Sequence, residues 1–547
     1  MASVISSSSC LLRSSVVKER DYTFCPSPKT TRHFLIAPGP GHTSLFSKQP
    51  SLSLSLSFNR VFSSSDESVS ETTTSTAPSV FECVEWEKDS GIVGIYGEPE
   101  AFLLCQRALS SLQHRGQDGA GITVFHNNAL QSITGLGLLH DVFKDPIAPP
   151  PGTSAIGHVH YMFSSIQPCN SGYRGAIAYT GKIFNHRALR KRLESLGCIF
   201  TTFSDVEVVL HLMDISKSSP CPSSIEERLI RSCEELEGAY SMVILTEGKL
   251  VAVRDPLGFR PLVMGRRSNG AVVFASETNA LDVIEAHFER REVNPGEALV
   301  VDADADRMIR SFSLLRDQSP PKSKVCIFEH IYSSLPSSII SGRSVSAFRH
   351  ALGEILATEN PVDCDVVIAV TESGAIPAQG YASKACIPLL HDVLLEKLGP
   401  TFNDPPSKID SDLTSLTPLH SPAKLKAGLK GKRVVVVDDS LVRAVESSKI
   451  FRFLKEAGAE QVHMRIACPP VNGFCYYGMK LPHKLNPTIL ESRGYDSVAF
   501  LSLDKLREFL GEEAAASFCY GCFSGNYPLP PPKEERTAAE QWCSPEF

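Results

Sequence analysis

From Ser90 onward, short apolar runs alternate with Gly, Asp and Asn, which predicts a series of β-strands joined by turns. The runs read SGIVGIYG, GAGITVF, AIGHVHYMF, AIAYTGKIF, YSMVILTEGKLVAVRD and AVVFASE. Between some of them, EVVLHLMDIS and SSIEERLIRSCEELEGA carry apolar residues at helical spacing. This part of the chain is therefore expected to form packed sheets with helices on the outside.

From about Pro321 the pattern changes to alternating strands and helices. VDCDVVIAV precedes the helical GYASKA, and GKRVVVVDD precedes SSKIFRFLKEAGA and then VHMRIA. The second of these helices places Ile450, Phe451, Leu454 and Ala457 on one face. Such βαβ units predict a parallel sheet, and the polar, Pro-containing stretch 318–324 is the expected linker between the two domains.

The two ends of the chain differ from the middle. The first sixty or so residues are rich in Ser, contain scattered Arg and Lys, and hold few acids, which is typical of an organellar transit peptide. The last residues include PLPPPKEER and predict a disordered end or linker. The expected organisation is a leader over 1–80, domains over 90–318 and 322–527, and a tail over 528–547.

Bulk composition narrows the class of protein. A chain of 547 residues with 42% hydrophobic content fits two domains. No apolar run reaches the roughly 18 residues that a spanning helix needs, so no membrane association is expected. A net charge of -7 argues against a nucleic-acid partner. The sixteen cysteines are interpreted as thiols or metal ligands, because long chains in reducing compartments seldom use disulfides.

Several motifs together resemble the glutamine phosphoribosylpyrophosphate amidotransferase family, also called amidophosphoribosyltransferases, over residues 90–527. They are SGIVGIYG, LQHRGQDGAGI, FSDVEVVLHL, CIFEHIY, VVVVDDSLVR and FCYGCFSG, together with the long segment from YSMVILTEG to VVFASE. The resemblance implies an α/β multidomain fold: an N-terminal-nucleophile (αββα) glutaminase, or type 2 glutamine amidotransferase, then a type I phosphoribosyltransferase parallel-sheet fold. It implies purine synthesis from glutamine and phosphoribosylpyrophosphate, with phosphoribosylamine, glutamate and pyrophosphate as products. Plant members carry a plastid transit peptide, so the chloroplast stroma is the expected location.

The nucleophile position departs from the family pattern. The family uses a cysteine directly before the GxVGI strand, exposed by propeptide cleavage so that its own α-amino group acts as base. This chain has Ser90 there, and Cys83 lies too far upstream to substitute. A hydroxyl is far less acidic than a thiol and needs stronger activation.

The expected glutamine pocket is changed in the same direction. His160 stands where the family has the arginine that binds the substrate carboxylate, which removes a bidentate clamp. Thr180 replaces the asparagine of the oxyanion hole, while the neighbouring Gly181 remains. Asp205, which matches the residue that holds the substrate amine, and Arg115 also remain. For these last two, a purely structural role in turns and strand ends is an equal alternative.

The second expected site is altered at its phosphate loop. Asp438 and Asp439 match the acidic pair that contacts the ribose hydroxyls and the Mg²⁺ of bound phosphoribosylpyrophosphate. The following loop reads SLVRAVES, so Glu446 lies where the family has a threonine near the 5′-phosphate. A carboxylate about 5 Å from a phosphate costs on the order of 3 kcal/mol at an effective dielectric near 20. At a helix start, the same charge stabilises the helix by about 0.3–1 kcal/mol.

Two further segments of this site differ. The family's PDSG pyrophosphate loop reads TESG here, over Thr371–Gly374 and including Ser373, and its mobile loop reads LLEKLGPTF over Leu394–Phe402. The arginine expected above the pyrophosphate is missing from the mobile loop. The changes concentrate on residues that face substrate, whereas the core strands persist.

Four cysteines match the ligands of the family's iron–sulfur cluster. Cys326 precedes IFEHIY, Cys475 follows in FCYYG, and Cys519 and Cys522 form a CxxC near the end. The resemblance therefore implies a [4Fe–4S] cofactor, since four thiolates suit such a cluster. A structural zinc site built from the same cysteines is the alternative.

Together these features predict an amidophosphoribosyltransferase-like protein that is catalytically impaired, a pseudoenzyme that acts as a regulatory or structural partner of an active paralogue. The alternative is an active enzyme that uses Ser90 and altered contacts. A third hypothesis is a binding module that senses a nucleotide. The expected assembly is a homo-oligomer or a hetero-oligomer with an active paralogue. Glutamine and phosphoribosylpyrophosphate are the small-molecule partners if the protein is active, with Mg²⁺ if phosphoribosylpyrophosphate binds.

Overall fold

The computed structural model describes most of the chain from Ser90 onward. The described residues are 90–127, 129–144, 150–161, 169–170, 175–202, 204–217, 224–246, 248–302, 308–315, 321–370, 373–390, 395–396, 416–417, 428–441, 444–479 and 494–530. The predicted leader over 1–80 and all but the first residues of the predicted tail lie outside them.

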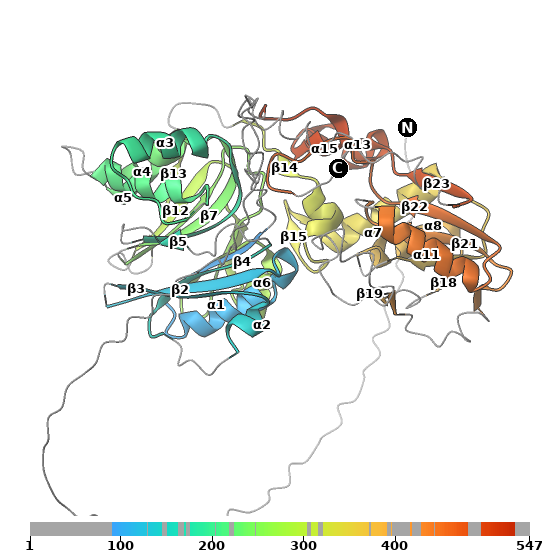
Figure 1. Cartoon of the computed structure of the whole chain (residues 1–547), viewed down its shortest axis with the longest axis horizontal. Helices are drawn as coiled ribbons and strands as arrows, with labels where there is room; N and C mark the ends of the chain where they lie inside the picture. Colours follow the sequence, from blue (N-terminus) through green and yellow to red (C-terminus); the bar gives the residue numbers. More distant parts are fainter. Residues whose placement is uncertain are drawn as a thin grey trace, which may run out of the picture. The chain divides into compact units, whose positions relative to one another are not determined.

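Two antiparallel sheets form the first half (Figure 1). The described strands of the first sheet, in spatial order, are β11 (Phe288–Glu292), β9 (Val263–Arg266), β10 (Val272–Ala275), β1 (Ser90–Tyr96), β4 (Ser154–His160), β2 (Gly119–His126) and β3 (Ala129–Leu136). Those of the second are β13 (Ile309–Ser313), β12 (Glu297–Asp302), β8 (Lys249–Arg254), β7 (Gly238–Thr246), β6 (Gly175–Ile183) and β5 (Cys169–Asn170). The predicted strands are therefore confirmed in this half.

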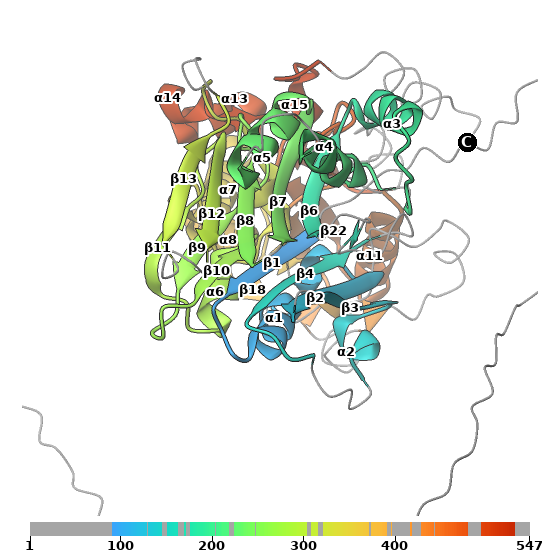
Figure 2. The same cartoon turned by 90° about the vertical axis from the view of Figure 1, so that its left-hand side faces the viewer.

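The central strands of both sheets are buried on both faces because each sheet packs against the other on one side and against helices on the other (Figure 2). In β1, Ile92 and Tyr96 face the second sheet, whereas Val93 and Ile95 face the helices beneath the first. This explains why SGIVGIY is apolar nearly throughout rather than alternating.

The helices cover the outer faces of the sandwich. Against the first sheet lie α1 (Ala101–Ser110), α2 (Leu139–Val142) and α6 (Thr278–Val283), and over the second lie α3 (His186–Ser195), α4 (Glu207–Lys217) and α5 (Ile225–Glu234). The start of α5 follows from its sequence, since the Ser224 hydroxyl accepts from the Glu227 backbone N–H at 3.3 Å. The expected sheet-and-helix layering is thus confirmed.

The second half contains a parallel sheet, as its βαβ pattern predicts (Figure 1). The described strands lie in the order β18 (Leu389–Leu390), β17 (Val366–Ala369), β21 (Arg433–Asp438), β22 (Gln461–Ile466) and β23 (Ser497–Phe500), and the main helices are α7 (Val345–Glu359), α8 (Ala375–Ala385) and α11 (Ala444–Glu456). Ile450 and Leu454 of α11 are buried, as expected. Gly458, with φ of +96°, follows the end of that helix.

Short elements complete the fold. They are β14 (Val325–Cys326) paired with β24 (Phe518–Cys519), β15 (Ile339–Ile340) paired with β16 (Arg343–Ser344), β19 (Leu395–Glu396) paired with β20 (Leu416–Thr417), the 3₁₀ turn Gln113–Arg115 of the first half, a π-helical turn over Glu329–Ser333, and the helices α13 (Leu503–Leu510), α14 (Glu512–Ala515) and α15 (Gly521–Ser524). In the part of the chain described, no helix is long and apolar enough to span a membrane.

Candidate functional site

Strand register places four polar side chains between the two sheets. Three of them were selected from the sequence, and the fourth, His158, was not. Ser90 pairs with His160, and Ile92 pairs with His158. Because alternate residues share a face and Ile92 faces the second sheet, Ser90, His158 and His160 face it too. Thr180 of β6 faces the first sheet, since Ala176 and Ala178 do. We call Ser90, His158, His160 and Thr180 the Ser90 cluster.

The two histidines of this cluster are neutral at pH 7. Their rings stack with centroids 5.1 Å apart and planes at 19°. Burial lowers the pKa of His160 to about 4, which outweighs the opposing effect of Asp118, and burial followed by the charge of His160 lowers the pKa of His158. A neutral imidazole offers no ion pair to a substrate carboxylate, so the structure places a weaker group where a guanidinium is expected.

Several polar atoms of the Ser90 cluster lack partners. The Nε2 atom of His158 lies 3.1 Å from the Tyr179 carbonyl oxygen, which assigns the proton to that nitrogen. Among the described residues, the Nδ1 atom of His158, both ring nitrogens of His160 and the hydroxyl of Thr180 are buried without a hydrogen-bond partner. Buried polar atoms are rarely left in this state unless water or a ligand satisfies them.

Glycine makes room for the changed histidine. Gly119 of β2 lies opposite His160, and a Cβ at Gly119 would stand 2.4 Å from Cε1 of the His160 ring. The ring therefore lies over Gly119, on the side of β4 away from β1. The GQDGAGI motif supplies this glycine, but its relation to His160 depends on strand register.

Gly181, which the family resemblance assigns to the oxyanion hole, cannot be replaced by a residue with a side chain without a clash. Its φ is +133°, and a Cβ there would stand 2.0 Å from the carbonyl oxygen of Ala239. Gly478 of the second half lies against it, since a Cβ at Gly478 would be 3.1 Å from the Gly181 backbone. This approach of the second half to the Ser90 cluster has no local sequence signal.

Asp205 lies beside the end of β6. Its carboxylate accepts a hydrogen bond from the Tyr179 hydroxyl and another from the Ile183 backbone N–H at 2.8 Å. The Tyr179 ring packs on the helix side of the second sheet, so Asp205 lies on that side of β6. In this position the Asp205 carboxylate holds the end of β6. Each of its oxygens can still accept one more hydrogen bond.

Arg115 lies in a buried group of charges that joins the two halves, and the next residue, Gly116, packs against the backbone of His160. Its guanidinium contacts Glu277 at 2.5 Å and Glu329 at 2.6 Å, and it donates to the Ser334 hydroxyl at 2.9 Å. We call Arg115, Glu277 and Glu329 the charged joint. All three side chains are fully buried, so the joint is shielded from solvent.

The electrostatics of the charged joint favour ionised carboxylates. Burial alone would raise the pKa of Glu277, but the charges of Arg115 and His114 outweigh it and hold the pKa below its usual range. Glu329 is likewise lowered by Arg115 and Arg260 against the effect of burial. Hydrogen bonds from Leu335 N–H at 2.9 Å and the Ser338 hydroxyl at 2.6 Å complete the shell of Glu277.

At the carboxyl edge of the parallel sheet, the structure brings Ser373, Asp438 and Asp439 together. The Ser373 hydroxyl donates to Oδ1 of Asp439 at 3.0 Å, and the Asp439 backbone N–H donates to Oδ1 of Asp438 at 2.9 Å. Strands β17 and β21 are adjacent, so their following loops meet at this edge, where ligands bind in open α/β sheets. This agrees with the predicted grouping of the three residues.

Arg349 of α7 is a buried residue near this edge that sequence reasoning missed. It donates to the carbonyl oxygens of His330 at 3.0 Å and Ser334 at 2.7 Å. Burial lowers its pKa, and the first opposing charge is Asp439. Ser334 also contacts Arg115, so Arg349 lies between the charged joint and the acidic pair.

The phosphate loop is described only in part. Glu446 is the third residue of α11 and thus belongs to its first turn, as expected. Its side chain, the residues Val442 and Arg443, Thr371 of the TESG loop and most of Leu394–Phe402 lie outside the described residues. The proposed repulsion by Glu446 stays a prediction.

The four selected cysteines lie in one buried region. Cys326 and Cys519 are opposite each other in the β14–β24 pair, and both lie in the same core as Cys475 and Cys522. Burial raises the pKa of Cys522 well above its usual value, and the charges of Cys475, Cys326 and Cys519 add to the effect. Such mutual influence requires the four sulfurs to be near neighbours, which fits a shared metal group.

No three donors among the described residues converge on a point as the ligands of a single metal ion do. A tetrahedral zinc site has Zn–S distances of about 2.3 Å and therefore needs sulfurs within about 4 Å of one another. A four-iron cluster holds its thiolates farther apart, because each sulfur binds a different iron atom. The choice between a cluster and zinc stays a prediction.

Comparison with known proteins agrees with this geometry. Residues 158–283 match the family model described as a glutamine amidotransferase domain. Amidophosphoribosyltransferase, chloroplastic, of Glycine max is 53% identical over 468 residues, covering 81% of this chain and 79% of the relative. Amidophosphoribosyltransferase 1, chloroplastic, of Arabidopsis thaliana is 49% identical over 557 residues, covering 97% of this chain and 95% of the relative.

A solved structure extends the likeness to the whole fold. Glutamine phosphoribosylpyrophosphate amidotransferase from B. subtilis, complexed with ADP and GMP, has a TM-score of 0.71 and 34% sequence identity. The match covers 81% of this chain and 98% of that chain. The expected glutaminase fold followed by a phosphoribosyltransferase fold is thereby confirmed. The chain belongs to the amidophosphoribosyltransferase family.

Proposed function

We propose that this chain is an amidophosphoribosyltransferase-type protein of purine synthesis, located in the plastid stroma, whose glutaminase reaction is impaired. The observation that carries the proposal is the Ser90 cluster, in which His160 is the register partner of Ser90 and its buried ring is neutral. The family reaction needs a nucleophile, an oxyanion hole and a carboxylate clamp. In this chain all three positions hold weaker groups.

The consequence for glutamine hydrolysis follows from each group in turn. The Ser90 hydroxyl is a weaker nucleophile than a thiolate near neutral pH. Thr180 replaces a positioned amide donor, and loss of one such donor typically costs about 10²- to 10³-fold in rate. Neutral His160 supplies no charge to the substrate carboxylate. These losses act on one step, so glutamine turnover is expected to be very slow.

We propose that the phosphoribosyl site retains its acidic pair but binds the 5′-phosphate of its substrate only weakly. Asp438 and Asp439 would hold the Mg²⁺ of phosphoribosylpyrophosphate, since carboxylates are preferred ligands of this ion. Glu446 in the first turn of α11 would place a negative charge at the helix start where the 5′-phosphate should bind. The helix gains from this charge, whereas the ligand is repelled.

We propose that Cys326, Cys475, Cys519 and Cys522 hold a [4Fe–4S] cluster that cross-links β14, β24 and α15. Its support is the burial of all four thiols in one core and their mutual electrostatic influence. Iron and acid-labile sulfide are expected in anaerobically purified protein, with loss of both when Cys475 is replaced by Ser. Zinc without sulfide would show that the cluster assignment is wrong.

A chain with this scaffold and impaired sites is proposed to act as a regulatory or structural partner of an active paralogue. Oligomer surfaces depend on the fold rather than on catalysis, so they persist when turnover is lost. A tagged chain expressed in plastids is expected to co-purify with an active amidophosphoribosyltransferase. Recovery of the tagged chain alone under gentle conditions would contradict this role.

The second candidate is an active enzyme, favoured by the intact contact of Ser373 with Asp439. It requires a mature chain that begins at Ser90, because only then is an α-amino base available. Mass spectrometry of the mature protein separates the two candidates. The impaired-enzyme proposal predicts residues retained before Ser90, whereas a start at Ser90 together with glutamate production would establish the active enzyme.

A further inference from the structure

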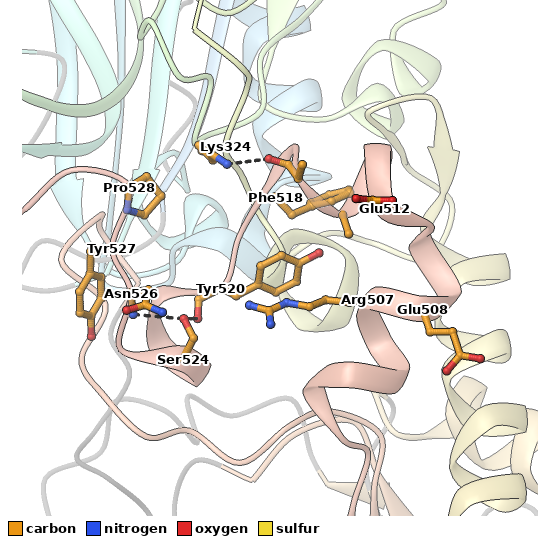
Figure 3. A pocket seen from close by; sticks show the side chains of 12 residues that line it. Lys324, Arg507, Glu508, Glu512, Phe518, Tyr520, Ser524, Asn526, Tyr527 and Pro528 are labelled. Carbon is orange, nitrogen blue, oxygen red and sulfur yellow. Dashed lines mark hydrogen bonds between the residues drawn. The ribbon is translucent and has the colours of Figure 1, made fainter.

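A cavity of about 670 Å³ lies beside α13, α14 and α15 (Figure 3). Its volume falls in the range of about 300–1,000 Å³ that is typical of small-molecule sites. No residue of the Ser90 cluster, the charged joint or the acidic pair lines it. The cavity is therefore separate from both proposed substrate sites.

Aromatic side chains form much of the cavity wall. Phe518, Tyr520, Tyr527 and Pro528 line it, and Figure 3 shows the Tyr520 ring between Phe518 and Arg507. Tyr520 is only 7% exposed, and its hydroxyl has no hydrogen-bond partner in the described part of the chain. Such flat apolar walls suit a planar ring.

Arg507 gives the cavity a prepositioned positive charge. Its guanidinium carbon lies 5.1 Å from the centre of the Tyr520 ring, a cation–π distance. The side chain is exposed, and no carboxylate of the described residues pairs with it. Because the Arg507 guanidinium is already held against the Tyr520 ring, the side chain loses less conformational entropy when it binds an anion.

The remaining charges leave the wall with a positive excess. The Lys324 ammonium donates to the Ala516 carbonyl oxygen at 2.6 Å, which leaves two of its three N–H groups for other acceptors. Glu508 pairs with Lys505 at 2.8 Å, so its charge is already met. Glu512 remains as a single opposing carboxylate in the first turn of α14. Two cations therefore face one unpaired anion.

We infer that this cavity is a binding site for a small planar aromatic anion. The ring of the ligand packs against Phe518 and Tyr527, and its anionic group meets Arg507. Residues 518 and 520 flank Cys519, so a bound ligand stabilises the segment that carries this thiol. The inference is independent of the proposed function.

Calorimetry with 2-naphthoate and its neutral analogue 2-naphthamide tests the site on the full chain. The carboxylate is expected to bind at least tenfold more tightly than the amide and to raise the melting temperature. The Arg507→Gln variant is expected to lose about tenfold or more in naphthoate affinity, and Arg507→Lys to lose less. Lys384→Gln, a substitution of an exposed cation on α8, serves as the charge control and should change nothing.

Tyr520→Phe tests whether the ligand uses the ring of Tyr520 or its hydroxyl. The hydroxyl is enclosed and unpartnered, so its removal should lower neither the melting temperature of the free protein nor the affinity for naphthoate. Equal binding of the two probes, no binding of naphthoate, or unchanged affinity in Arg507→Gln with an intact fold would each overturn the inference.

Discussion

The charged joint and the Ser90 cluster are both buried and polar, but their polar groups are compensated to different extents. In the joint, Arg115 lies within 2.6 Å of two carboxylates, and hydrogen bonds from Leu335 and Ser338 complete the shell of Glu277. In the cluster, His160 and Thr180 retain buried polar atoms without partners among the described residues. Oε1 of Glu329 lacks a hydrogen bond but lies 3.3 Å from the Arg260 guanidinium. In the joint, opposite charges thus compensate one another, whereas the neutral polar atoms of the cluster have no such compensation among the described residues.

The largest expected effect is the loss of folding stability when the charged joint is broken. Replacing Arg115 by Met leaves two buried carboxylates without their main counter-charge, which should lower the free energy of unfolding by about 3–5 kcal/mol. Denaturant unfolding measures the loss. Arg192→Met is the matched control, because Arg192 pairs with Glu235 at the surface and should contribute about 1 kcal/mol or less. Equal small losses in both variants would mean that the joint does not hold the halves together.

The next effect concerns catalysis in the Ser90 cluster. Ser90→Cys alone should give little glutaminase activity, because the oxyanion donor and clamp are still missing. Adding Thr180→Asn and His160→Arg should raise glutamate production from glutamine about 10²-fold or more over Ser90→Cys. The assay uses chains that begin at residue 90. Rapid glutamine hydrolysis by the unaltered sequence would contradict the contrast between cluster and joint.

The neutral state of the buried histidines should make the free energy of unfolding depend on pH in the acid range. The folded pKa of His160, about 4, lies below the unfolded value near 6.5, so the unfolded state binds more protons between these pH values. Stability therefore falls as pH decreases from about 6.5 to 4, by on the order of 3 kcal/mol for this residue. His160→Asn should remove that part of the pH dependence, measured by unfolding at several pH values.

Exposed His140 provides the control for this acid effect. His140→Asn should leave the pH profile unchanged. A profile for His160→Asn that superimposes on the unaltered protein would show that His160 is not held neutral by burial.

The sequence was sufficient for much of the fold because local periodicity encodes it. The run RVVVVD predicts a strand buried on both faces, and β21 is central in the parallel sheet with Asp438 at its end. Gly181 was selected by motif, and its φ of +133° explains the glycine. Ser373 and Asp439 were assigned to one site by motif, and the structure places them in hydrogen-bond contact.

The sequence did not predict the charged joint, since its partners are far apart along the chain. Arg115 and Glu329 are separated by 214 residues, and no local pattern records such a pair. The stacking of His158 on His160 and the approach of Gly478 to Gly181 likewise depend on register and on packing between the halves. Arg115 and Asp205 were selected by motif, but only three-dimensional contacts show that Arg115 pairs with Glu277 and Glu329 and that Asp205 accepts from Tyr179 and Ile183.

The most direct test of the central claim is pyrophosphate release from phosphoribosylpyrophosphate with ammonia as the nitrogen source. It uses the anaerobically purified chain from Ser90 onward, compared with its Glu446→Thr variant. The account predicts little or no release by the unaltered chain and about a hundredfold tighter phosphoribosylpyrophosphate binding in the variant, since about 3 kcal/mol of repulsion is removed. Release by the unaltered chain at the rate of an active family member, with no gain in the variant, would contradict it.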